Sequence, residues 1–181
     1  MKMKKFIYAF LILATFGISS CSKDDNNETP KPTNYYNFGD EKIEIKWAGY
    51  YKYDQGDYQF AIAPKVPNNA ISLYKDDDYF VMELPQEKLG QLNNLSDNLD
   101  GNSWDFYSAF VHKGNYYDIR DQQSENDGDA VTGTNNWFKV VKESGDHTYT
   151  LEFEITVDGK PFKGKYTGPF TKTTDYMDWG S

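Results

Sequence analysis

The chain of 181 residues contains a single cysteine, so no disulfide bond can form within it. Its two histidines do not form an H-E-x-x-H motif, and phosphate-cradling glycine loops and the G-x-S-x-G nucleophile elbow are also missing. No apolar run reaches the roughly 18 residues that a membrane-spanning helix needs. The sequence therefore lacks the familiar motifs of metallopeptidases, nucleotide-binding proteins and α/β-hydrolases. We expect no cofactor, no catalytic residue and no enzymatic activity.

Basic residues are also scarce. The chain has 19 Lys and Arg against 28 Asp and Glu, a formal charge of -9. Three of the lysines lie within the first twenty residues, which leaves 16 basic against 28 acidic residues in the remainder. Such a surface repels phosphate backbones and anionic lipid headgroups. Nucleic acid is thus not an expected partner, and attachment to a membrane must have another source.

Aromatic residues, in contrast, are abundant: 15 Tyr, 12 Phe and 4 Trp make up 17% of the chain. Rings in this number can build a core, and Tyr, Phe and Thr favour strands over helices. The composition therefore indicates an all-β protein.

The N-terminal residues have the organisation of a signal peptide. M-K-M-K-K is a positively charged start, and residues 6–18, F-I-Y-A-F-L-I-L-A-T-F-G-I, form an apolar run. As a helix this run would extend about 20 Å, short of the roughly 30 Å hydrocarbon core of a bilayer. We expect residues 1–20 to be a cleaved signal peptide.

The sequence I-S-S-C starts at the last residue of this run, Ile18, and ends at Cys21. Here the chain resembles a bacterial lipoprotein, in which an apolar residue and two small residues precede the lipidated cysteine. The resemblance implies cleavage between Ser20 and Cys21 and acylation of Cys21 with palmitate-like chains, which would make the lipid bilayer a partner. The alternative is an ordinary secretory signal followed by an unpaired cysteine.

Residues 22–28, S-K-D-D-N-N-E, resemble the acidic tags that direct some lipoproteins to the outer face of the outer membrane. We expect an outer-membrane lipoprotein exposed at the cell surface, with a periplasmic-facing location as the alternative. Residues 21–36 contain Pro30 and Pro32 and read as a flexible acidic tether. The β domain is expected over residues 37–181.

The clearest structural signal is a hairpin at residues 148–169. Apolar residues alternate with Thr and Glu up to Asp158-Gly159, a pair suited to a two-residue turn. This turn fixes a register in which apolar pairs share one face and ion pairs the other. The predicted pairs are Val157–Lys160, Ile155–Phe162, Leu151–Tyr166, Glu154–Lys163 and Glu152–Lys165. At Gly164 and Gly168 the apolar face is interrupted, which suggests that a large ring crosses the strand there.

Further strands are expected in segments with similar alternation, separated by tight turns. They cover residues 41–53, 57–63, 70–74, 78–84, 104–112, 116–119 and 136–143. Only residues 85–92, which start with Pro85, fit a short helix. About eight strands with at most one short helix indicate an antiparallel sandwich or a flattened up-and-down, lipocalin-like barrel.

Two features of the sequence bear on metal binding. Residues 121–129, D-Q-Q-S-E-N-D-G-D, fail the EF-hand pattern because Thr134 would occupy the position of its bidentate Glu. A looser calcium site in this loop stays open, although no metal is predicted. His112 and His147 flank predicted turns and are expected to be solvated.

Clusters of rings are the best indication of function. Adjacent tyrosines in a strand point to opposite faces, so some rings must lie on the surface. Exposed rings beside polar side chains suit stacking on sugars or a protein interface, unless these rings fill the core or cover its ends. The candidate ligand-binding residues are Trp47, Tyr51, Tyr53, Tyr116 and Trp179. The predicted function is a surface binding module for a glycan or protein. The alternatives are a small envelope hydrolase or inhibitor, and a carrier of an apolar ligand.

Overall fold

The computed structural model describes residues 33–73, 78–95, 107–120 and 135–179. These residues form twelve strands in two six-stranded sheets. In spatial order, sheet A contains β2 (Glu41–Glu44), β1 (Tyr35–Phe38), β11 (Lys160–Pro169), β10 (Thr148–Val157), β9 (Trp137–Lys142) and β6 (Leu92–Asn94). Sheet B contains β12 (Thr171–Lys172), β3 (Trp47–Lys52), β4 (Tyr58–Ala63), β5 (Tyr79–Leu84), β7 (Tyr107–His112) and β8 (Asn115–Arg120).

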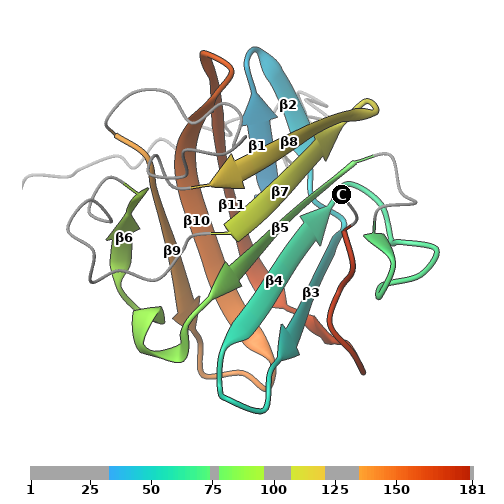
Figure 1. Ribbon diagram of the computed structural model, residues 1–181, viewed down its shortest axis with the longest axis vertical. Coiled ribbons are helices and arrows are strands. Elements are labelled where there is room, and N and C mark those ends of the chain that lie inside the picture. The colour runs from blue at the N-terminus through green and yellow to red at the C-terminus, as the bar shows by residue number, and fades with distance from the viewer. Residues whose placement is uncertain (1–32, 74–77, 96–106, 121–134, 180–181) are drawn as a thin grey trace, which may run out of the picture. The chain divides into compact units, whose positions relative to one another are not determined.

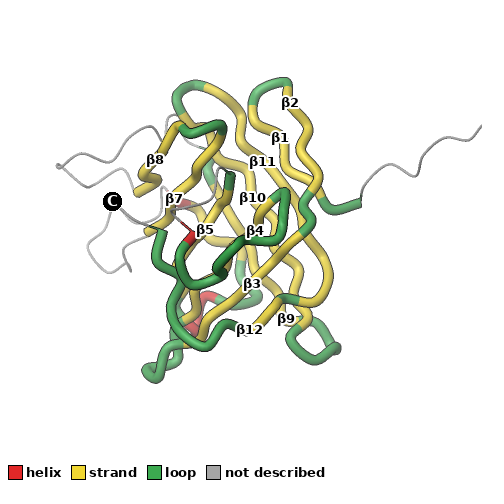
Figure 2. Tube along the Cα trace, turned by 90° about the vertical axis from the view of Figure 1, so that its right-hand side faces the viewer, coloured by secondary structure: helices red, strands yellow, loops and turns green. Residues whose placement is uncertain are grey.

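The two sheets pack face to face as a sandwich and do not close into a barrel (Figures 1 and 2). The all-β prediction is confirmed, and of the two architectures left open by the sequence the protein has the sandwich. Rings from both sheets meet in the core between them. The ring centroid of Phe162 in sheet A lies 5.1 Å from that of Phe80 and 4.0 Å from that of Phe110, both in sheet B. The abundant aromatic residues thus build the interior.

The predicted hairpin is confirmed in its register. β10 and β11 pair through ten residue pairs, and all five predicted pairs are among them. The ring of Phe153 lies over Gly164, as the interrupted apolar face predicted. At Gly168 the nearby ring is that of Tyr166, on the same strand. The turn residues Asp158 and Gly159 both have positive φ.

The predicted strand at residues 41–53 is divided into β2 in sheet A and β3 in sheet B. The chain changes sheets between them. The N–H of Ile45 donates to Asn34 on the sheet A side, and that of Lys46 donates to Ala63 of β4. Because the apolar alternation continues through this crossing, periodicity does not reveal it.

Several shorter elements also differ from expectation. β1 starts at Tyr35, two residues before the predicted start of the β domain. Residues 70–73 form turns against sheet B rather than a strand, and the predicted helix is a single 3-10 turn, η2 (Gln86–Lys88). The two-residue β12 pairs with β3 in parallel. Strands as short as β6 and β12 carry too few residues for a periodic signal, so the sequence underestimates the strand count.

Candidate functional site

Of the five candidate ring residues, Trp47 and Trp179 are buried, with 7% and 8% of their surfaces exposed. Both belong to a second apolar cluster on the outer face of sheet B, together with Tyr79 and Met177. Residues 173–179 pack against part of this face, where Met177 binds Gln59 of β4 and Trp179 binds Tyr79 of β5. The two tryptophans therefore contribute to packing in this structure.

The side chain of Gln59 on β4 fixes this C-terminal segment. Its Nε2 donates to the carbonyl of Met177 at 3.1 Å, and its Oε1 accepts from the backbone N–H of the same residue. The hydroxyl of Tyr79 donates to the carbonyl of Trp179 at 2.6 Å. Two backbone hydrogen bonds join the segment to the loop after β4: the N–H of Leu73 donates to the carbonyl of Asp178, and the N–H of Asp178 donates to the carbonyl of Ile71.

The remaining candidates, Tyr51, Tyr53 and Tyr116, are more exposed. Tyr51 and Tyr53 pack edge to face with centroids 5.0 Å apart, and the Tyr53 hydroxyl donates to Glu83 Oε1 at 2.7 Å. Burial raises the pKa of the Tyr53 phenol, and the bond to Glu83 raises it further. Tyr116 lies on β8, across β4, β5 and β7 from the strand of Tyr51. The structure does not bring the five candidates together in one site.

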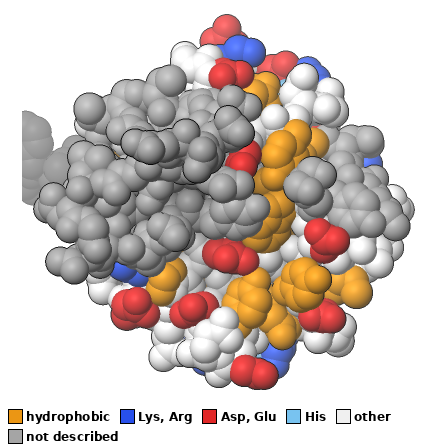
Figure 3. Space-filling view, in the orientation of Figure 1, with side chains coloured by type: hydrophobic (Ala, Val, Ile, Leu, Met, Phe, Trp, Pro, Cys, Tyr) orange, Lys and Arg blue, Asp and Glu red, His pale blue; other side chains and the backbone are white. Residues whose placement is uncertain are grey.

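Figure 3 shows the outer face of sheet B in the described residues. Hydrophobic side chains form a band interrupted by acidic groups. Glu83 lies on the outer side, since its neighbours in β5, Met82 and Leu84, are buried in the core. This face offers rings and carboxylates at its surface.

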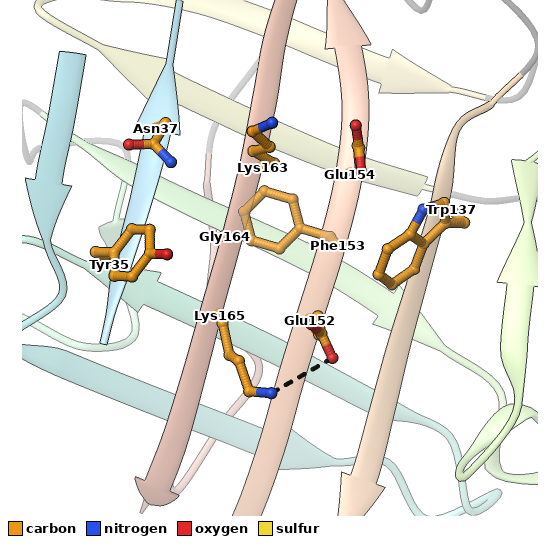
Figure 4. A pocket seen from close by; sticks show the side chains of 9 residues that line it. All are labelled: Tyr35, Asn37, Trp137, Glu152, Phe153, Glu154, Lys163, Gly164 and Lys165. Atoms are coloured by element: carbon orange, nitrogen blue, oxygen red, sulfur yellow. Dashed lines mark ion pairs between the residues drawn. The ribbon is translucent and has the colours of Figure 1, made fainter. Parts of the chain in front are cut away.

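A groove of about 190 Å³ lies on the opposite side of the sandwich, on the outer face of sheet A (Figure 4). Four strands contribute to it, and its centre is the backbone around Gly164. Its lining residues are Tyr35 and Asn37 from β1, Lys163, Gly164 and Lys165 from β11, Glu152, Phe153 and Glu154 from β10, and Trp137 from β9.

Strand alternation brings these side chains to the surface. In Y-Y-N-F, Tyr36 and Phe38 enter the core, so Tyr35 and Asn37 point outward. In β9 Phe138 and Val140 are buried, which places Trp137 outward. Both Tyr35 and Trp137 remain partly exposed. They stand at diagonally opposite ends of the groove.

Between the two rings lies a column of ammonium groups beside a column of carboxylates. Lys165 Nζ lies 3.7 Å from Glu152 Oε2, an ion pair that is about half exposed on each side. Glu154 and Lys163 face each other in the next register pair without forming an ion pair in the described structure. Their charged ends are left for solvent or a ligand.

Comparison with protein-family models, curated proteins and solved structures finds no match. Among the described residues, no helix is long and apolar enough to cross a membrane.

Sequence reasoning did not select Tyr35 and Trp137. A signal for both was present, because each shares its alternation phase with polar residues: Tyr35 with Asn37, and Trp137 with Lys139. Trp47 continues the alternation of Ile43 and Ile45. It nevertheless lies on the outer face of sheet B, because the chain passes from sheet A to sheet B between Ile45 and Trp47. Alternation identifies exposed rings only when the strand boundaries are known.

His112 is buried, contrary to the expectation of a solvated side chain. The ring of Phe110 stacks on it, with centroids 5.9 Å apart. Its Nδ1 lies 3.3 Å from Asp78 Oδ1 and its Nε2 3.6 Å from Glu41 Oε2. A hydrogen bond from Lys113 Nζ lowers the pKa of the Glu41 carboxyl. This polar cluster links turns at the ends of both sheets.

His147 is exposed, as expected, and its Nδ1 lies 2.6 Å from the Tyr50 hydroxyl. In the part of the chain that the structure describes, no group of three or more His, Cys, Asp or Glu is arranged to hold a metal ion. The acidic loop 121–129 lies outside the described residues, as do Ser20 and Cys21.

Proposed function

We propose that this protein is a membrane-anchored binding module that holds a glycan in the groove on the outer face of sheet A. The observation that carries the proposal is the pair of partly exposed rings, Tyr35 and Trp137, at the two ends of a polar groove. Sugar rings stack their C–H faces on aromatic rings, and their hydroxyls bond to charged and amide groups beside them.

The polar lining favours a glycan over a protein partner. A stable protein interface has an apolar, charge-depleted centre, whereas the middle of this groove carries two lysines and two glutamates. The alternative of an apolar-ligand carrier requires space between the sheets, and the core rings occupy that space. A sugar needs neither an apolar centre nor a lumen.

A glycan array probed with the protein lacking residues 1–21 tests this proposal. We expect wild-type protein to bind a defined set of glycans and Trp137→Ala to lose at least about tenfold in affinity. Tyr176→Ala is the control, because Tyr176 is 53% exposed but lies outside the groove. An array without any bound glycan would refute the proposal.

Hydrolysis is the second candidate, favoured by the positions of Glu152 and Glu154. As alternate residues of β10 they point to the same face, with Cα atoms about 7 Å apart. Glycosidases use carboxyl pairs separated by roughly 5–10 Å. Release of smaller sugars from a bound glycan, abolished in Glu154→Gln, would establish this activity; unchanged glycan after long incubation would exclude it.

The anchor belongs to the same proposal and is supported by the sequence I-S-S-C at residues 18–21. We expect cells fed labelled palmitate to label the wild-type protein and not Cys21→Ala. Two or three acyl chains suffice for stable attachment to a bilayer. Removal of the protein by protease added to intact cells would support surface exposure; protection until the cells are broken would favour the periplasmic-facing alternative.

A further inference from the structure

We infer that the groove selects an uncharged, hydroxyl-rich oligosaccharide that lies diagonally across four strands and contacts Tyr35 and Trp137 at the same time. The inference rests on the proposed function and specifies the ligand class.

The separation of the rings sets the length of the ligand. Tyr35 pairs with Lys165, Lys165 with Glu152, and Trp137 with Glu154, the next outward residue of β10. Three strand spacings and one two-residue offset place the Cα atoms of Tyr35 and Trp137 roughly 16 Å apart. A single sugar ring cannot touch both side chains. Only a chain of several sugars gains both stacking contacts.

The charges of the groove set the ligand's charge. The β11 side presents two ammonium groups, and the neighbouring β10 side presents two carboxylates. A charged group of either sign on the ligand would be attracted by one column of side chains and repelled by the other. Polyanionic glycans are also repelled by the net negative charge of the chain after residue 20, which has 16 basic against 28 acidic residues. Hydroxyl groups suit both columns, because they accept from Lys163 and donate to Glu154.

One ring is held by a neighbour within the protein. Lys42 Nζ lies 3.8 Å from the centroid of the Tyr35 ring, a cation–π contact that covers one face of the ring. The ring is thereby restrained and has one face left for a sugar. Trp137 is restrained instead by its place in β9, between β10 and β6. Preorganised rings bind with less loss of side-chain freedom.

The test is a titration of the full chain, purified in detergent, with neutral oligosaccharides of increasing length built from a sugar that binds. Affinity is expected to rise by about tenfold or more until the chain reaches both rings, and then to level off. Tyr35→Ala and Trp137→Ala should each weaken binding of the long chain. A single sugar stacks on only one of the two rings, so at least one of these variants should bind the single sugar within about twofold of wild type. Tyr176→Ala should leave the length dependence unchanged.

The outcomes separate the two proposals. If no glycan binds, the proposed function fails. If glycans bind but affinity does not depend on length, or if a uronic-acid or amino-sugar chain of equal length binds more tightly than the neutral chain, the inference is overturned while glycan binding stands. Circular dichroism of each variant distinguishes loss of the contact from loss of the fold.

Discussion

Gly164 lines the groove and also contacts the core, and a methyl group has no room there. A Cβ atom would lie 2.7 Å from Tyr36 Cβ and 2.8 Å from Phe153 Cζ. Both atoms belong to fully packed core residues. We expect Gly164→Ala to reduce the free energy of unfolding by about 1–3 kcal/mol, because neighbouring side chains must shift. Urea denaturation measures this loss.

Lys163→Ala is the matched control for that variant. It changes the adjacent residue of β11, whose side chain is exposed on the outer face. Its free energy of unfolding should stay within about 0.5 kcal/mol of wild type. Equal losses in both variants would show that crowding at Gly164 is not the cause.

Among the elements, the C-terminal segment 173–179 depends on one buried amide. Gln59 is almost completely buried and binds both the N–H and the C=O of Met177. In Gln59→Glu a second oxygen would face the Met177 carbonyl, and a charge would be buried. We expect a loss of about 2–3 kcal/mol at neutral pH, together with a change in tryptophan fluorescence as Trp179 becomes solvated.

Gln86→Glu provides the comparison, since Gln86 is exposed at η2. This variant should keep both the stability and the fluorescence of wild type. If Gln59→Glu also retained the stability and fluorescence of wild type, the hydrogen bonds from Gln59 to Met177 would not be what holds the segment.

The elements differ in how far the sequence predicts them. The β10–β11 hairpin is predictable because a two-residue turn and cross-strand charge pairs act over short sequence distances. The passage from β2 to β3 is not, because Ile45 and Lys46 keep the alternation while their backbones bond to different sheets. The burial of Trp47 is also hidden, since it depends on residues 173–179 folding back over β3 and β4.

In the candidate site, too, the sequence predicts only what depends on short sequence distances. Its lysines and glutamates were correctly placed on one face by the hairpin register. Its two rings come from β1 and β9, which flank that hairpin in space. Tyr35 lies over a hundred residues from Lys165 in the chain, and their pairing reflects the arrangement of the whole sheet.

At the scale of the whole molecule, the aromatic core predicts sensitivity to alkali. Burial is the main cause that raises the pKa values of Tyr36 and Tyr149 in the folded protein. The unfolded chain releases these protons near pH 10. The stabilisation by these protonated tyrosines is therefore fully present below about pH 10. It is lost as the pH rises from there toward the folded-state pKa values, because in this interval the phenols of the unfolded chain are ionised and those of the folded protein are not.

Urea midpoints measured across this alkaline range test the prediction, with Tyr36→Phe as the comparison. Within the described residues the buried Tyr36 hydroxyl has no hydrogen-bond partner. Its removal should leave stability at neutral pH unchanged or higher and make the alkaline loss shallower. Identical alkaline slopes in both proteins would mean that Tyr36 does not contribute.

The position of β1 has a mechanical consequence. This strand is bonded on one side to β2 and on the other to β11, and it carries Tyr35 at its first residue. Ladder hydrogen bonds run perpendicular to the strands, so a pull on the chain ahead of Tyr35 loads both ladders in shear. If the protein is tethered at Cys21, a force between a bound glycan and the membrane acts on the residue pairs that join β1 to β2 and β11. The strands of sheet B do not carry this force.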